Sequence, residues 1–225
     1  MINHPDLTTR TSPVSSLPNT IRNAVKNNAV FFAGSAVLAV IIVLIIVAYY
    51  GQRRIRSERA SQMLSLAKTS QQMEEILIQY PSSSSAPIAL LALASKAFTS
   101  GNYKEANARY NKFLKVYSDH STAIVAKFGK IMCQEAQGEI KQALAGFSTF
   151  ANVHPEHFLM PQAVFGKARC LQMLKQYAAA EKVYTDFINA HPDSNWMPQM
   201  KSALSFLQRE ERQQAQTDVA ASQDK

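Results

Sequence analysis

The chain has 225 residues, and its content of 47% hydrophobic and 18% charged residues excludes an intrinsically disordered protein. The formal net charge is +8, but lysine and arginine form no stripe interleaved with stacking aromatic residues, which argues against a nucleic-acid partner. The 2 cysteines are too few for a disulfide-stapled domain or a structural zinc site. Glycine is scarce, with 7 residues, so we expect a helical fold.

The first segment, residues 1–28, is rich in proline, serine, threonine and asparagine, which predicts a disordered tail. Residues 29–50 then read AVFFAGSAVLAVIIVLIIVAYY, without a single charge. At about 1.5 Å per residue such a helix is about 33 Å long, which is enough to cross a bilayer core. The run is too long for the apolar part of a signal peptide, and no small-x-small cleavage site follows it. We therefore predict one uncleaved transmembrane helix over residues 29–50.

The charges that flank this span bear on its orientation. Arg22 and Lys26 precede it, whereas four arginines follow it directly: Arg53, Arg54, Arg56 and Arg59. The positive-inside rule, taken alone, would keep the C-terminal domain in the cytoplasm. The rule weakens when a long domain follows, so the charges alone leave the orientation open.

Residues 51–80 are predicted to be a juxtamembrane segment and the first helix of a solenoid. From position 57 onward their apolar side chains fall on one helical face, and the segment could run straight on from the span. The face consists of Met63, Leu66, Ala67, Met73, Ile76, Leu77 and Tyr80.

Residues 81–213 repeat with a period of 37. The matching sets are Tyr103, Ile140 and Tyr177; Ala106, Ala143 and Ala180; Tyr110, Phe147 and Tyr184; and Phe113, Phe150 and Phe187. Within a unit these positions are three or four residues apart, which gives a helix one apolar face. Each unit is therefore predicted to be a pair of antiparallel helices, stacked on its neighbours to cover faces that a single hairpin leaves open.

The C-terminal part continues the same register. Residues 196–213 occupy the phase of a first helix and are predicted to be a capping helix with a charged outer face. Residues 214–225 are polar and are predicted to be a disordered tail. The expected fold class is thus all-α, with an N-terminal transmembrane helix followed by a helical-hairpin solenoid of period 37.

The repeat motif resembles the tetratricopeptide repeat. The motif reads Ser100–Gly101–Asn102–Tyr103, then Ala106, Tyr110 and Phe113. In that family these positions are structural, so the resemblance implies a fold and no chemistry. Departures from the family are a period of 37 rather than about 34, the missing first-helix tryptophan, and a displaced series of small residues in place of the usual Leu-Gly pair: Ala92, Gly129 and Gly166.

The whole plan of tail, span, basic segment and repeat domain is similar to the ancillary Sec-translocon subunit family of bacterial inner membranes. That resemblance implies a single-pass inner-membrane protein whose repeat domain faces the periplasm, which is opposite to what the arginine count indicates. It also implies protein partners, namely the Sec translocon or newly exported clients.

Candidate sites for chemistry are few. No catalytic, metal-binding or cofactor-binding motif is recognisable, so we expect no enzyme activity, no cofactor and no small-molecule substrate. Cys133 and Cys170 hold equivalent places in adjacent first helices and are interpreted as two buried thiols. Because first helices line the concave groove of tetratricopeptide domains, the resemblance implies that four basic residues face an acidic or carboxylate-ended peptide: Lys127, Lys130, Lys167 and Arg169. The alternative is that they are ordinary solvent-facing side chains.

Two classes of function remain open. The repeats could form a binding module that holds a client polypeptide or a component of a translocon or envelope complex. Alternatively, the span and the juxtamembrane helix could assemble a membrane complex, with the repeats as a structural adaptor. An apolar, aromatic groove would favour the binding module, whereas a polar groove would favour the adaptor.

Overall fold

The computed structural model describes the backbone of residues 19–223 and the side chains of residues 34–213 and Gln216. The described residues form nine helices and no strand, which confirms the predicted all-α class. The helices are α1 (Asn19–Leu66), α2 (Ser70–Gln79), α3 (Ser85–Thr99), α4 (Tyr103–Val116), α5 (Ala123–Ala136), α6 (Ile140–Val153), α7 (Met160–Met173), α8 (Tyr177–Ala190) and α9 (Met197–Gln223). The chain divides after Arg56 into two compact units.

Helix α1 carries the predicted span. Its stretch Gly34–Leu66 reaches a mean hydropathy of 2.4 over 18 residues, and none of that window is buried within the chain. The apolar side chains along it are about half exposed, as in Leu44 and Val47, at 61% each. The helix is thus long and apolar enough to be a candidate membrane span. The predicted tail over residues 1–28 lies mostly outside the described residues, and α1 begins within it at Asn19.

The segment predicted to run on from the span is two helices. Residues 57–66 do continue α1, but the helix ends at Leu66 and α2 begins at Ser70. Thr69 caps α2, since its hydroxyl accepts a hydrogen bond from the Gln72 N–H at 3.2 Å. The Gln72 side chain in turn accepts one from the Thr69 N–H at 3.1 Å. This capping box could be recognised in the sequence as Thr-x-x-Gln before an apolar run.

The end of α1 and α2 pack as a helical pair at the start of the repeat domain. Ala60, Ile76 and Ala89 are all fully buried and form one core cluster. Ala60 lies 37 residues before Ala97 of α3, and Ile76 lies 37 residues before Phe113 of α4. This pair therefore occupies the place of a further hairpin.

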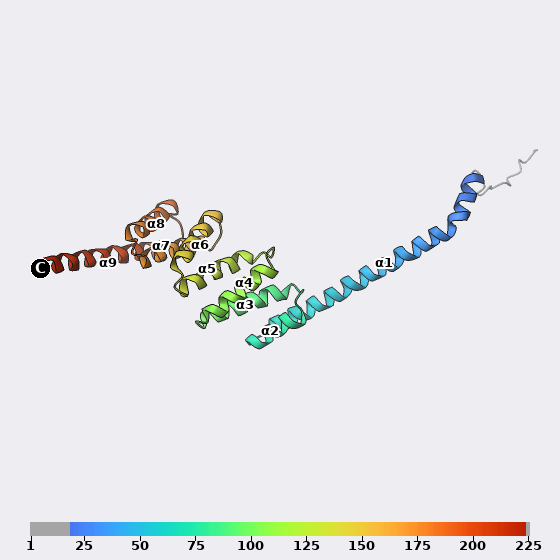
Figure 1. Cartoon of the computed structure of the whole chain (residues 1–225), viewed down its shortest axis with the longest axis horizontal. Coiled ribbons are helices and arrows are strands. Elements are labelled where there is room, and N and C mark those ends of the chain that lie inside the picture. The colour runs from blue at the N-terminus through green and yellow to red at the C-terminus, as the bar shows by residue number, and fades with distance from the viewer. Residues whose placement is uncertain (1–18, 224–225) are drawn as a thin grey trace, which may run out of the picture. The chain divides into compact units, whose positions relative to one another are not determined.

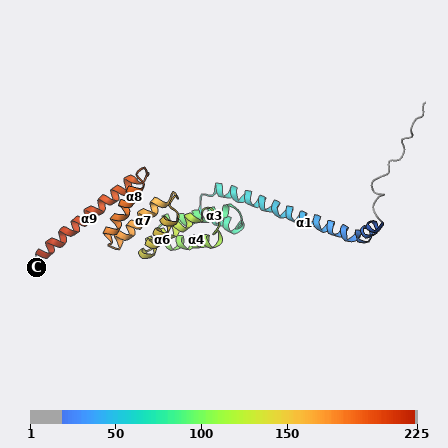
Figure 2. The ribbon, with the colours of Figure 1, turned by 90° about the horizontal axis from the view of Figure 1, so that it is seen from above.

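The remaining helices follow one another as hairpins. The second helices α4, α6 and α8 begin at Tyr103, Ile140 and Tyr177, so that successive starts are 37 residues apart. Each helix packs chiefly on the next one along the chain. Figures 1 and 2 show this succession from α3 to α9 in two perpendicular views.

The hairpins are held together by the residues that recur. Ala106, Ala143 and Ala180 are completely buried, and the aromatic residue one turn later is at most 6% exposed in each unit. In the first two of these units the ring packs against a glycine of the next first helix, whereas the equivalent residue of α9 is Ala203. A Cβ atom at Gly166 would lie 2.7 Å from the ring of Phe147, and one at Gly129 would be closer still to the ring of Tyr110. Two of the small residues that depart from the family pattern, Gly129 and Gly166, therefore make room for these rings.

The turns within the hairpins require a left-handed backbone. Gly101 and Gly138 have φ angles of 77° and 80°, which glycine adopts without steric cost. The equivalent place in the third unit is held by Lys175 at φ 59°. The structure thus keeps one turn geometry even where the sequence lacks glycine.

Helix α9 closes the array. Met200 and Leu207 are fully buried in one cluster with Tyr184 and Phe187 of α8. The helix was predicted to end at residue 213, but it continues to Gln223. Residues 209–216 contain only good helix formers, with neither glycine nor proline to stop the helix, which explains why part of the predicted tail is helical.

Candidate functional site

A hollow with a volume of about 670 Å³ lies between α7, α8 and α9, and we call it the α7–α9 hollow. Its lining includes Phe165, Arg169 and Gln172 of α7. Residues at these spacings share one helical face. The lining residues Ser202, Phe206 and Arg209 of α9 lie 37 residues further on. The hollow is therefore built from the same three repeat positions of two successive first helices.

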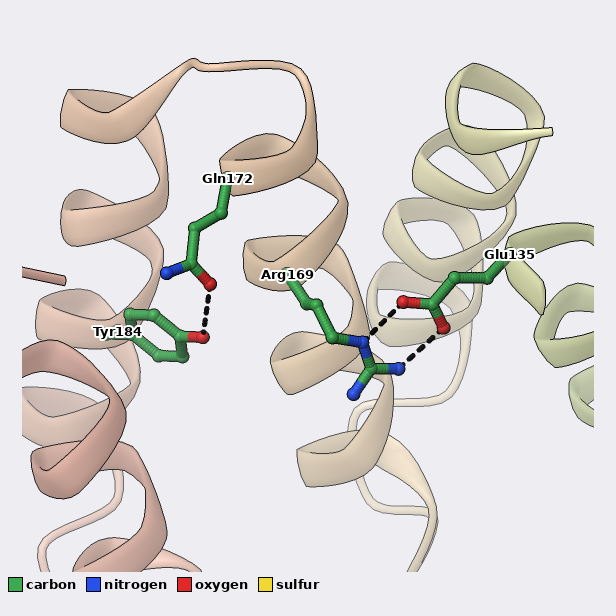
Figure 3. A network of polar contacts seen from close by, with 4 residues as sticks. All are labelled: Glu135, Arg169, Gln172 and Tyr184. Atoms are coloured by element: carbon green, nitrogen blue, oxygen red, sulfur yellow. Dashed lines mark hydrogen bonds and ion pairs between the residues drawn. The ribbon is translucent and has the colours of Figure 1, made fainter. Parts of the chain in front are cut away.

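Arg169 is fixed by an ion pair with Glu135 of α5. Its Nη2 donates a hydrogen bond to Glu135 Oε2 at 2.5 Å, and its Nε donates one to Oε1 (Figure 3). This hydrogen bonding raises the pKa of Arg169, although burial opposes it. The Glu135 side chain is only 10% exposed, whereas that of Arg169 is 44% exposed. The pair joins two first helices and leaves the guanidinium at the surface.

Tyr184 of α8 adds a neutral hydroxyl to the hollow. The hydroxyl donates a hydrogen bond to Oε1 of Gln172 at 3.3 Å (Figure 3). Burial raises the pKa of Tyr184, while the charge of Arg169 lowers it. The phenol therefore stays protonated at neutral pH and serves as a hydrogen-bonding group rather than as an anion.

Aromatic rings supply the rest of the lining. The Cζ atom of Arg169 lies 5.7 Å from the centroid of the Phe165 ring, a cation–π arrangement. The rings of Phe165 and Tyr184 are 5.9 Å apart. Phe206 is 53% exposed, although the next residue, Leu207, is fully buried. The hollow can therefore accept an apolar side chain together with polar groups.

The four basic residues predicted to share one groove do not all lie on one surface, although Lys130 and Lys167 hold the same repeat position, 37 residues apart. Lys127 is exposed on α5 and Lys130 is half-buried there. Lys167 lines a second, smaller hollow of about 230 Å³, together with residues of α6 and α8. Arg169, two residues further along α7, lines the α7–α9 hollow instead. Since neighbours at this spacing point to opposite sides of a helix, Lys167 and Arg169 do not share a surface.

Sequence reasoning missed Glu135, Phe206 and Arg209. The 37-residue register could have found the last two, because Phe206 and Arg209 match Arg169 and Gln172. The Glu135 pair could not have been found in this way, because it joins different positions of two repeats, 34 residues apart.

The two cysteines are structural, as predicted. Both are completely buried and both are free thiols. Burial raises the pKa of each to about 11, so both thiols stay protonated at neutral pH. His154 and His157, which lie in the turn between α6 and α7, have ring centroids 5.2 Å and 5.7 Å from that of Phe150.

The comparisons with known proteins agree with this architecture. The family model of the tetratricopeptide repeat matches residues 162–194, which include most of α7 and all of α8. No curated protein matches the chain.

Among solved structures, a tetratricopeptide repeat protein from Parabacteroides merdae aligns with a TM-score of 0.52 and 16% identity. The match covers 70% of this chain and 60% of that one. A Podosopora anserina protein of nearly identical TPR-like repeats aligns with a TM-score of 0.55 and 15% identity, covering 76% and 93% of the two chains. The MamA RS-1 double mutant aligns with a TM-score of 0.53 and 13% identity, covering 71% and 85%. These likenesses show the fold alone.

The repeat domain thus has the fold of tetratricopeptide repeats. Repeats of this type suggest a module for protein–protein interaction.

Proposed function

We propose that this chain is a membrane-anchored interaction module, in which α1 crosses the membrane and the repeat domain holds a segment of another polypeptide. The observation that carries the proposal is the α7–α9 hollow, which is lined by Phe165 and by the half-exposed Phe206. Apolar surface gathered in a hollow and rimmed by polar groups is typical of a binding site. It fits the binding module better than a spacer, for which a polar groove would be expected.

The shape of the hollow suits a polypeptide. Its two walls repeat the same positions of α7 and α9, so a segment lying across them meets similar geometry at each step. Glu135 extends polar contacts of this face to α5. Because one hollow of this kind buries little area, we expect a dissociation constant in the micromolar range or weaker, ~1 μM or above.

We further propose that the membrane is the inner membrane of a bacterium and that the repeat domain lies on its periplasmic side. The plan of the chain, similar to the ancillary Sec-translocon subunit family, supports this orientation, although the four arginines after the span favour the opposite one. Partners would then be exported clients or components of the export machinery. A reporter active only outside the cytoplasm, fused after Lys225, should be active. Its silence beside an active cytoplasmic reporter would exclude this orientation.

One observation favours the structural adaptor as a second candidate. Helix α1 continues without a break to Leu66, and its residue Ala60 is fully buried in the first cluster of the repeat domain. A continuous helix of this kind could hold the repeats as a spacer, with partners bound by the apolar stretch of α1.

Site-specific photocrosslinking in cells separates the two candidates. A photoreactive phenylalanine at position 206 should crosslink a partner protein. The matched control is the same amino acid at position 158, where the native phenylalanine is 72% exposed, more than Phe206, but does not line the hollow. Crosslinks from position 206 alone support the binding module. Crosslinks that arise only from positions on the apolar stretch of α1, such as Leu44, would contradict it and favour the adaptor.

A further inference from the structure

Two charged side chains line the α7–α9 hollow, and both are arginines. They differ in whether a carboxylate pairs with them. Arg169 donates two hydrogen bonds to Glu135, and within the described residues its Nη1 makes none (Figure 3). Arg209 is exposed and forms no ion pair with any described residue. No carboxylate is among the described residues that line the hollow. The hollow thus contains one compensated guanidinium and one that is open to an anion.

The apolar groups lie beside these charges. Phe165 is in contact with Arg169, and Phe206 precedes Arg209 by three residues on the same face of α9. Both rings are accessible from the hollow, and Phe206 is 53% exposed. A ligand that satisfied only the charge would leave these rings in water, and a purely apolar ligand would leave Arg209 without a partner while excluding water from it.

We propose that the α7–α9 hollow selects polypeptide segments in which a carboxylate side chain neighbours a large apolar one, a specificity that rests on the proposed function. Arg209 binds the carboxylate, and the apolar side chain packs between Phe165 and Phe206. Glu135 holds Arg169 in place and cancels most of its charge. Arg209 is therefore the side chain that makes the hollow prefer a carboxylate to a neutral group. Hydrogen bonds between guanidinium and carboxylate are stronger than those to a neutral amide.

The test is fluorescence polarisation with the full chain in nanodiscs of a neutral lipid, phosphatidylcholine. The acidic probe is the labelled peptide Gly-Ser-Ala-Ala-Asp-Phe-Ala-Ser-Gly, in which Phe is the only large apolar residue, and the matched amide probe carries Asn in place of Asp. We expect the acidic probe to bind about five- to tenfold more tightly than the amide probe, because the amide keeps the shape but not the charge. Replacing Phe in the acidic probe by Ala should weaken binding to a similar extent.

Variants of the protein assign the effect to the hollow. Arg209→Gln should bring the ratio of the two affinities down to about one, since a neutral side chain no longer distinguishes Asp from Asn. Glu135→Gln should raise the ratio, because the charge of Arg169 is then uncompensated. The matched control is Arg212→Gln, which removes another exposed arginine of α9 that does not line the hollow. Using a ratio cancels small changes in the shape of the hollow.

Each outcome decides the matter. An acidic preference that Arg209→Gln removes and Arg212→Gln preserves supports the inference. Equal binding of the acidic and amide probes, or no binding of the acidic probe up to ~1 mM, overturns it. If the peptide test fails in this way but position 206 still crosslinks a partner, the proposed function stands and only the proposed specificity is wrong. Loss of both would remove the proposed function as well.

Discussion

The buried positions of the repeats and the exposed positions of their first helices differ in how far they recur. Inside the domain the alanine of every second helix and the ring one turn later recur in all three units, and each is almost fully buried. On the surface, the place of Arg169 is held by Met132 in the preceding unit and by Phe206 in the next. Stacking needs the same contact at every step, whereas binding does not, so we infer that recurrence marks the fold and its loss marks the site.

The largest expected effect tests the recurrent contact between ring and glycine. Gly166→Val should lower the free energy of unfolding by about 3 kcal/mol, because the ring of Phe147 occupies the space that the new side chain needs. Urea denaturation followed by circular dichroism measures this loss. Lys141→Ala, at an exposed position of α6, serves as the control and should leave stability nearly unchanged. Equal losses in the two variants would mean that the repeat register assigned here is wrong.

A second, smaller effect concerns the recurrent cysteines. Their pKa values rise from an ordinary 9.0 to about 11 because the folded chain buries the thiols. The unfolded chain therefore releases these protons first as pH rises. The stability that the two thiols contribute should be complete below about pH 9 and lost as pH rises through about 11.

Thermal unfolding measured between pH 8 and pH 11 checks this dependence. Replacing Cys133 and Cys170 together by alanine should make the decline in melting temperature shallower in this range. Tyr110, whose pKa burial raises to about 12, should still cause a decline above pH 10. An unchanged slope in the double variant would mean that the thiols are not excluded from water in the folded state.

The fold could be predicted from the sequence because its determinants recur within short distances. Ala143, Phe147 and Phe150 lie on one face of one helix, and the same pattern returns in the next unit, so local periodicity carries the information. The α7–α9 hollow depends instead on which side of α7 faces α9. Lys167 and Arg169 look equivalent as a pair of basic residues, but a separation of two residues sends them to opposite sides of the helix.

Other features depend on contacts between units or on a single local signal. The ion pair between Glu135 and Arg169 joins α5 to α7, so it cannot be predicted from a sequence pattern within either helix. The break between α1 and α2, in contrast, has a local signal, which a longer apolar pattern masks. Its capping box at Thr69 and Gln72 is local, but the apolar face that runs through residues 57–80 suggested a single helix.

The smallest expected effect tests a position where recurrence fails inside the fold. Lys175 has φ 59° where the two preceding units have Gly101 and Gly138. A side chain in this left-handed region costs about 1 kcal/mol, whereas glycine adopts it freely but gives the unfolded chain more conformational freedom. Because the first term exceeds the second, Lys175→Gly should raise the free energy of unfolding by about 0.5 kcal/mol, visible as a higher urea midpoint at an unchanged slope. The reverse change, Gly138→Lys, should lower the midpoint. If both changes lowered it, the Lys175 side chain would have to make a contact in the folded chain that outweighs the strain, and the turn would then be stabilised by a contact that the other units lack.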